Sequence, residues 1–339
     1  MSATTATLAS GAGFSEKLRT LATRRAGWVP VLAAVVIFAA MLVAGQLYFG
    51  TFVSPRLLSS LLLDNAYLLI LAVGMTFVIL TGGIDLSVGS VMAFTGILGA
   101  RMLRDGMSAG VVIPVMLVAG AILGLFTGVL VQYFDVQPFI ASLATMFLAR
   151  GLAFVVSLEA IQVKDPLFDA LQSSRFRLDG GWYITPTVIL SLIAVAVAAW
   201  VLGWTRFGRT VYAVGGSEQS ARLMGLPVAR VKLLVYVISG LCAGIAGVVF
   251  TAYTGAGYSL NGIGAELDTI AAVVIGGTLL TGGSGYVLGS LFGVLVYGLI
   301  KVSISFLGAD TSWMRITIGA LLLVFVVVQR LIVTRARRR

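Results

Sequence analysis

The chain has 339 residues, of which 59% are hydrophobic and only 11% are charged. Soluble domains contain about 45–50% apolar and about 25% charged residues, so this composition excludes an ordinary soluble protein and predicts an all-α polytopic membrane protein. The net charge of +10 does not indicate a nucleic-acid partner, because the basic residues gather in loops and tails. With no histidine and a single cysteine, Cys242, the sequence excludes a histidine-ligated metal and an intrachain disulfide, and we expect no metal site.

Apolar runs long enough to cross a bilayer divide the chain into about ten helices. We expect these helices at 28–49, 57–80, 85–101, 109–132, 138–157, 184–203, 232–254, 266–280, 285–307 and 313–333. The helices 85–101 and 266–280 are short and adjoin Gly-Gly breaks, so each either spans the membrane or re-enters it. A single transmembrane domain, 28–333, would then lie between basic tails at 1–27 and 334–339.

Basic residues predict the orientation of these helices. They concentrate in both tails and in the loop 204–231, which the positive-inside rule places in the cytoplasm. We therefore expect a multi-pass protein of a bacterial inner membrane with both termini cytoplasmic and the polar loop 158–183 periplasmic. The N-terminal segment does not resemble a cleavable signal, because a long polar stretch precedes a full-length span.

Two similar breaks interrupt the apolar pattern at a separation of 200 residues. Residues 81–90 read T-G-G-I-D-L-S-V-G-S, and residues 281–290 read T-G-G-S-G-Y-V-L-G-S. Broken helices are tolerated in a membrane where the freed backbone groups face protein or a water-filled cavity. We therefore expect two pseudo-repeated halves around one pathway, with helix breaks at Gly82, Gly83, Gly282 and Gly283.

The loop 204–231 is predicted to contain a two-turn helix. Ser217 fits the N-cap, Glu218 suits the first turn, Gly225 fits the position after the last turn, and Pro227 prevents continuation. A helix of two turns has little stability alone in water. We therefore expect it either to rest on the bilayer or to insert into a cytoplasmic partner. The apolar patch would be Ala221, Leu223 and Met224. The candidate docking residues are Ser217, Glu218, Gln219, Ala221, Arg222, Leu223, Met224 and Gly225.

Several stretches resemble the ribose-type sugar permeases of ABC transporters. These are G-M-T-F-V-I-L-T-G-G-I-D-L-S-V-G-S at 74–90 and V-V-I-G-G-T-L-L-T-G-G at 273–283. Glu218-Gln219-Ser220-Ala221, with Gly225, is similar to the E-A-A…G segment that docks on the ATPase, although it departs from that pattern. The resemblance covers 57–331, and the phrases 64–80, 205–216 and 264–280 look most like galactofuranose permeases.

This resemblance implies the permease subunit of a binding-protein-dependent sugar importer. It implies a cytoplasmic ABC ATPase, a second permease subunit in a homo- or heterodimer, and a periplasmic sugar-binding protein, all at the lipid bilayer. The chain lacks the G-x-x-x-x-G-K-[S/T] phosphate loop, so we expect no cofactor in it, ATP and magnesium on the partner ATPase, and no enzymatic activity of its own.

A neutral sugar needs amides, hydroxyls and aromatic faces along its path. The candidate path residues are Asn65, Tyr67, Thr76, Thr81, Asp85, Ser87, Phe139, Ser142 and Thr145, each of which could instead serve packing. Asp85 with Ser87 could cap the restarted helix, and Asp64 could mirror Asp268 across the repeat. Two alternatives stay open: an ion-coupled secondary transporter, and an ABC permease for ribose, another sugar or branched-chain amino acids.

Overall fold

The computed structural model describes residues 29–50, 52–177 and 179–308, and the positions 310, 312–313, 316–320, 323–324 and 327. Within these residues the chain is mostly helical, and six helices are long and apolar enough to cross a membrane. They are α2 (Val29–Phe49), α6 (Ala109–Tyr133), α7 (Pro138–Val156), α9 (Pro186–Trp204), α12 (Val228–Thr254) and α14 (Val287–Phe306). The architecture is therefore that of a polytopic, all-helical membrane protein, as the composition predicted.

The single helix predicted at 57–80 is wrong, because the structure breaks it at Asn65. α3 (Pro55–Asp64) and α4 (Ala66–Leu80) meet there at an angle of 54° and count as a seventh span if the pair is taken together. The Asn65 side-chain amide donates to the Leu61 carbonyl oxygen at 2.8 Å, which is the acceptor that the Asn65 backbone N–H would use in a regular helix. That N–H turns to the Leu63 carbonyl instead, which ends α3.

The two short predicted helices are present as α5 (Val88–Arg104) and α13 (Ala265–Ile275). α13 has 11 residues and is about 16 Å long, which is shorter than the ~30 Å hydrocarbon core. It ends five residues before the predicted boundary at 280, because Gly277 adopts a φ of +92° and the chain leaves the helix at Gly276. The last predicted helix, 313–333, lies largely outside the described residues.

The predicted loops contain more structure than their composition indicated. The segment 158–183 holds β1 (Ile161–Gln162), α8 (Pro166–Ser173), β2 (Phe176–Arg177) and η1 (Asp179–Gly181), followed by β3 (Tyr183–Ile184). β1 pairs in antiparallel fashion with β4 (Ala256–Gly257), and β2 pairs with β3. In the loop 204–231, α10 (Arg206–Gly216) was not predicted; Thr205 caps it by accepting a hydrogen bond from Gly208 N at 3.1 Å.

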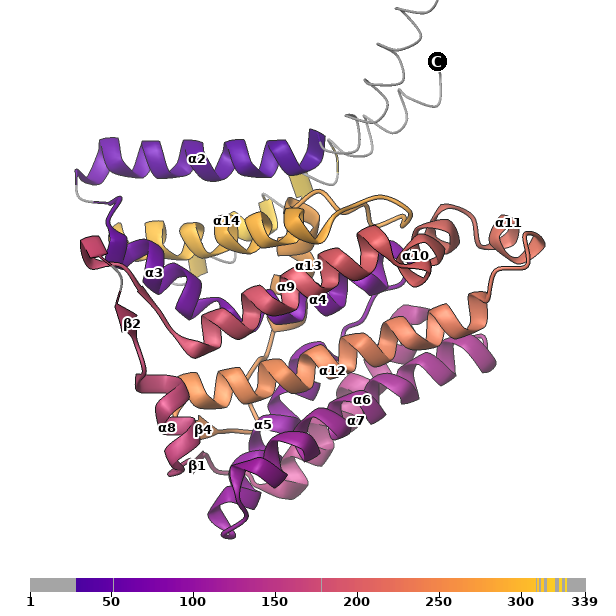
Figure 1. Ribbon diagram of the computed structural model, residues 1–339, viewed down its shortest axis with the longest axis horizontal. Helices are drawn as coiled ribbons and strands as arrows, with labels where there is room; N and C mark the ends of the chain where they lie inside the picture. Colours follow the sequence, from indigo (N-terminus) through magenta and orange to yellow (C-terminus); the bar gives the residue numbers. More distant parts are fainter. Residues whose placement is uncertain are drawn as a thin grey trace, which may run out of the picture.

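The helices lie roughly side by side, with α11 (Glu218–Leu223) at one end of the molecule and α8 and β2 at the other (Figure 1). The core surrounds α4, in which every residue except Tyr67 is buried. α12 packs on α6 through glycines, since a Cβ on Gly240 would lie 2.8 Å from Gly124 Cα. Such close backbone contact is a principal way for helices to associate in lipid. We call the two ends the α11 end and the α8 end.

Candidate functional site

The predicted docking helix is present as α11, and its cap is the expected one. Ser217 accepts a hydrogen bond from Ser220 N at 3.2 Å, and Gly225 takes the left-handed φ of +74° that ends the helix. The tip is exposed, with Leu223 at 84% and Met224 at 67%. Ala221 does not belong to the apolar patch as we predicted, because it is fully buried on the inner side of the helix.

Ion pairs fix α11 to the body of the protein. Glu218 accepts from Lys232 of α12 at 2.5 Å and from Arg222 at 2.6 Å. Partial burial raises the pKa of the Glu218 carboxyl, but the hydrogen bonds and charges of Lys232 and Arg222 outweigh this effect and leave the pKa below its usual value. Glu218 is therefore ionised at neutral pH and orients α11 relative to α12. Gln219 and Arg222 remain exposed beside it.

The two T-G-G breaks lie against each other, and α10 lies against both. Gly283 N donates to the Leu80 carbonyl oxygen at 2.9 Å, and a Cβ on Gly282 would lie 2.8 Å from Gly82 N. Gly215 of α10 fits so tightly that a Cβ on it would collide with the Leu80 carbonyl oxygen. We call this meeting point of 80–83, 215–216 and 282–283 the glycine junction. It connects the helix that leads to α11 with both breaks.

Asp85 follows the first break and is buried, with 1% of its surface exposed. Its Oδ1 accepts from Ser87 N at 2.9 Å and from Ser87 Oγ at 2.6 Å, and its Oδ2 accepts from Ser239 Oγ of α12 at 2.7 Å. Three hydrogen bonds compensate a buried carboxylate that would otherwise be very costly. The predicted cap of α5 is not formed, because the N-cap residue Ser87 makes no side-chain capping hydrogen bond and Asp85 accepts from the N–H of Ser87 itself. Asp85 links the start of α5 to Ser239 of α12.

The other predicted path residues do not form one site. Thr76 of α4 bonds Ser290 of α14 at 2.8 Å, and Thr127 of α6 donates to Thr145 of α7 at 2.7 Å. These are hydroxyl contacts between helices, a packing role that polar residues often serve in membranes. Of the remaining candidates, Ser142 is buried and Thr81 half-buried, each bonded to a carbonyl of its own helix, while Phe139 is 52% exposed on α7.

A different group of side chains gathers where α3 breaks into α4. Tyr253 Oη donates to Asp64 Oδ1 at 3.0 Å, and the Tyr297 hydroxyl bonds the Asp268 side chain. Tyr67 interacts electrostatically with both acids, and its ring meets Phe250 edge-on at a centroid distance of 4.8 Å. We call Asp64, Tyr67, Tyr253, Asp268 and Tyr297 the tyrosine–carboxylate cluster.

Asn65 adjoins the tyrosine–carboxylate cluster and is buried, and its side-chain carbonyl oxygen has no hydrogen-bond partner among the described residues. The structure thus brings together Asn65 and Tyr67, with the proposed mirror pair Asp64 and Asp268. Aromatic faces beside acceptors for hydroxyl groups are the groups that bind a neutral polyol. The described residues contain no group of three or more Cys, Asp or Glu side chains placed to hold a metal.

Comparisons with known proteins identify the family. The model of the family described as "Branched-chain amino acid transport system / permease component" matches residues 57–326. The chain belongs to this permease family. It is 46% identical over 310 residues to the fructose import permease protein FruG of Bifidobacterium longum (strain NCC 2705), covering 89% of this chain and 91% of that protein. No solved structure matches it.

Two further relatives come from Escherichia coli (strain K12). The permease is 46% identical over 308 residues to the inner membrane ABC transporter permease protein YjfF, covering 89% of this chain and 92% of that protein. It is 39% identical over 266 residues to the ribose import permease protein RbsC, covering 76% and 81%. The predicted resemblance to ribose-type ABC permeases is confirmed, and these relatives are permease subunits, in agreement with the prediction that the chain is not itself an enzyme.

Sequence reasoning missed three members of the aromatic neighbourhood: Phe250, Tyr253 and Tyr297. A signal was present, because Phe250 and Tyr253 are three residues apart and so share one face of a helix. Nothing in the sequence of α14, however, places Tyr297 beside Asp268 of α13. That contact depends on how α13 and α14 pack in the permease.

Proposed function

We propose that this permease is the transmembrane subunit of a binding-protein-dependent sugar importer, powered by ATP hydrolysis on a separate cytoplasmic ATPase. The observation that carries the proposal is α11. This capped helix, tied to α12 by Glu218 and Lys232, presents the exposed side chains of Leu223 and Met224. Exposed apolar side chains on a rigid element favour insertion into a protein partner. Family membership supports the same reading and disfavours an ion-coupled secondary transporter.

The route by which the ATPase would act on the path follows the contacts. A push on α11 moves α10, whose Gly215 and Gly216 touch Leu80 and Gly283 at the glycine junction. Rigid elements in backbone contact transmit displacement better than loosely packed side chains. From the junction, α4 leads to the tyrosine–carboxylate cluster at its other end. The α11 helix and the cluster are thus connected by two helices, α10 and α4, which meet at the glycine junction.

The orientation follows from charge. We infer that the α11 end faces the cytoplasm of a bacterial inner membrane, because the two tails and the loop 204–231 together hold more basic residues than the segments predicted outside. Cytoplasmic termini then require an even number of membrane segments, and the ten predicted segments in two pseudo-repeated halves satisfy this requirement. The contact between the two T-G-G turns supports the repeat.

The α8 end offers a surface for a periplasmic sugar-binding protein. A cavity of about 990 Å³ lies between α3, the β2–β3 ribbon and the end of α14. Arg56, Arg175, Arg177 and Asp179 line it together with Trp182. Charged and aromatic side chains of this kind favour a transient, polar interface. A second permease subunit would complete the transport path.

We propose a monosaccharide as the substrate, with galactofuranose as the specific candidate. The relatives FruG and RbsC are named for fructose and ribose, whereas the family description names branched-chain amino acids. The tyrosine–carboxylate cluster favours the sugar, because hydroxyl groups can donate to Asp64 and Asp268 while a tyrosine ring covers the apolar face. The phrases that resemble galactofuranose permeases, 64–80 and 264–280, contain Asp64, Tyr67 and Asp268.

Co-purification with the ATPase tests the docking proposal. Leu223→Glu places a charge at the exposed tip of α11, and we expect the ATPase to be lost from the purified complex while the permease stays in the membrane. The matched control is Leu158→Glu, since Leu158 is 73% exposed beyond α7 at the α8 end. If both variants retain the ATPase equally, α11 is not the docking element.

A further inference from the structure

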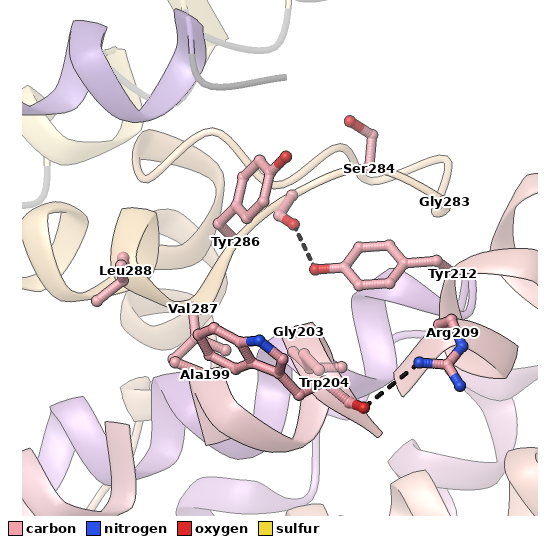
Figure 2. Close-up of a pocket in the computed structure, with 12 residues that line it drawn as sticks. Ala199, Gly203, Trp204, Arg209, Tyr212, Gly283, Ser284, Tyr286, Val287 and Leu288 are labelled. Atoms are coloured by element: carbon pink, nitrogen blue, oxygen red, sulfur yellow. Dashed lines mark hydrogen bonds between the residues drawn. The ribbon is translucent and has the colours of Figure 1, made fainter. Parts of the chain in front are cut away.

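Two adjoining pockets at the α11 end lie beside the glycine junction, and Gly283 of the junction lines the first of them. The first, of about 660 Å³, lies between the end of α9, α10 and residues 283–288 (Figure 2). The second, of about 670 Å³, lies between α10 and the beginning of α12. Arg209 lines both pockets, so a single extended ligand can reach from one to the other.

The pockets carry positive charge without a balancing acid. Arg206, Arg209 and Arg230 line the second pocket, and no aspartate or glutamate lines either one. Across the described parts of the chain, no carboxylate forms an ion pair with any of these arginines. Arg209 donates to the Trp204 carbonyl oxygen at 3.3 Å, which holds its guanidinium at the side of the first pocket (Figure 2).

The rest of the first pocket is apolar and aromatic. Figure 2 shows the rings of Trp204, Tyr212 and Tyr286 around it, and the Tyr212 hydroxyl donates to the Gly285 carbonyl oxygen at 2.8 Å. Tryptophan and tyrosine are the residues enriched at the level of lipid headgroups. Leu202, Val287 and Leu288 also line the pocket. A ligand here would meet charge at one side and hydrocarbon at the other.

An exposed apolar row leads away from this pocket along α9. Ile193, Val197, Trp200 and Trp204 are 53%, 53%, 58% and 73% exposed. Their spacing places them on one face of the helix. Because α9 is long and apolar enough to span the membrane, this face is available to acyl chains that start at the pocket.

We propose that these pockets bind an anionic phospholipid from the adjacent leaflet, with its phosphate at Arg206, Arg209 and Arg230 and its acyl chains along the exposed row of α9. The guanidinium group binds phosphate oxygens in a bidentate manner, and basic pockets between membrane helices suit anionic headgroups. A choline lipid should bind less tightly, because the positive charge of its ammonium group would lie beside the three arginines that hold its phosphate. The inference requires only that the chain lies in a membrane, and does not depend on the sugar or the ATPase.

Native mass spectrometry of the purified permease tests this site. Phosphatidylglycerol and phosphatidylcholine with the same acyl chains are titrated separately, and we expect phosphatidylglycerol to bind at least tenfold more tightly. Arg209→Ala should weaken phosphatidylglycerol binding by about fivefold. Arg209→Lys should weaken it by less, because lysine keeps the positive charge but cannot bind two phosphate oxygens in a bidentate manner. Arg104→Ala, an exposed arginine at the end of α5, is the control and should change nothing.

Three results would overturn the proposal. Equal affinity for the two lipids would show that the pockets bind acyl chains without selecting the headgroup. Equal phosphatidylglycerol binding by the Arg209→Ala and Arg104→Ala variants would show that Arg209 does not bind the phosphate. Displacement of phosphatidylglycerol by equimolar glycerol 3-phosphate would assign the site to a soluble phosphate. The readout contains no sugar, nucleotide or ATPase, so failure here is separate from failure of the proposed function. Each variant is compared only if its unfolding temperature in phosphatidylcholine matches the wild type.

Discussion

The two T-G-G breaks share a turn but are held in place differently. Gly82 and Gly282 adopt nearly the same φ, +81° and +83°. After the first break the chain buries Asp85, whose carboxylate binds Ser87 and Ser239. After the second break the corresponding position is Gly285, and its carbonyl oxygen accepts a hydrogen bond from Tyr212 of α10.

The difference assigns the breaks different mechanical roles. The first is fixed to α12 inside the core by a buried acid. The second is tied by its Gly285 carbonyl to α10, the helix that leads to α11. A displacement of α10 therefore reaches the second break directly through the hydrogen bond of Tyr212. It reaches the first break through the close backbone packing of Gly215 against Leu80. One sequence motif thus supplies a fixed turn and a turn that follows α10.

The largest expected effect is that of Gly215→Ala at the glycine junction. The new Cβ would collide with the Leu80 carbonyl oxygen and lie 2.5 Å from Gly283 N, and these backbone atoms cannot move away cheaply. We expect a loss of about 3 kcal/mol in the free energy of unfolding, measured as a lower unfolding temperature. Gly216→Ala is the matched control, because nothing lies within 4 Å of its Cβ position. Equal unfolding temperatures for the two variants would contradict the close packing of Gly215 at the glycine junction.

Removing the acid of the first break comes next. Asp85→Ala leaves the Ser87 and Ser239 donors without their buried acceptor, so we expect a loss of about 2 kcal/mol in the free energy of unfolding. Ser284→Ala, in the second break, should cost less than about 0.5 kcal/mol. Chemical unfolding of both variants in one detergent measures the difference. If the two costs are the same, the breaks are not held differently.

Loosening the second break should have a smaller and local effect. Tyr212→Phe removes the hydrogen bond to Gly285 and should cost about 1 kcal/mol. Hydrogen exchange should accelerate about fivefold at the amides of 283–286 and remain unchanged at Ser87 in the first break. Acceleration at both breaks would show that they open as one unit.

The smallest expected effect concerns the pH dependence of α11. Because the folded protein lowers the pKa of Glu218, its ion pairs stabilise α11 fully above the unfolded pKa of about 4.5, and this stabilisation is lost as the pH falls through the lower folded value. The pair is partly exposed, so its contribution is under about 1 kcal/mol. The protection factors of the amides 218–224, which are the exchange rates corrected for the pH dependence of intrinsic exchange, should fall between pH 5 and pH 3 in the wild type, whereas those of Glu218→Gln should be equally low at both. A wild-type protection that is independent of pH would contradict the role of Glu218.

Local sequence signals predicted the parts of the molecule that local interactions determine. The bounds of α11 were predicted because each signal acts within a few positions: Ser217 caps its start, Gly225 takes the left-handed conformation after its end, and Pro227 prevents the helix from continuing. The two T-G-G breaks were equally visible. The break at Asn65 was not, because asparagine within an apolar run gives no sign that its side chain will take the Leu61 carbonyl.

The candidate site was predicted only in part, because it depends on packing between distant segments. Asn65 and Tyr67 lie where the site forms, but Tyr253 and Tyr297 come from other helices and carry no motif. Thr76 and Thr145, which were predicted for the path, bond Ser290 and Thr127 of neighbouring helices. A hydroxyl within an apolar helix gives the same sequence signal whether it faces a path or another helix.

The energy source of transport is the most direct test of the central claim, that this permease is a conduit driven by another protein's ATP cycle. Proteoliposomes containing the permease, its ATPase, a second permease subunit and the sugar-binding protein would be assayed for uptake of labelled galactofuranose. We expect uptake that requires ATP on the α11 side, persists when ionophores collapse all ion gradients, and disappears with Leu223→Glu but not with Leu158→Glu. Accumulation by the permease alone, driven by an ion gradient without ATP, would contradict the account.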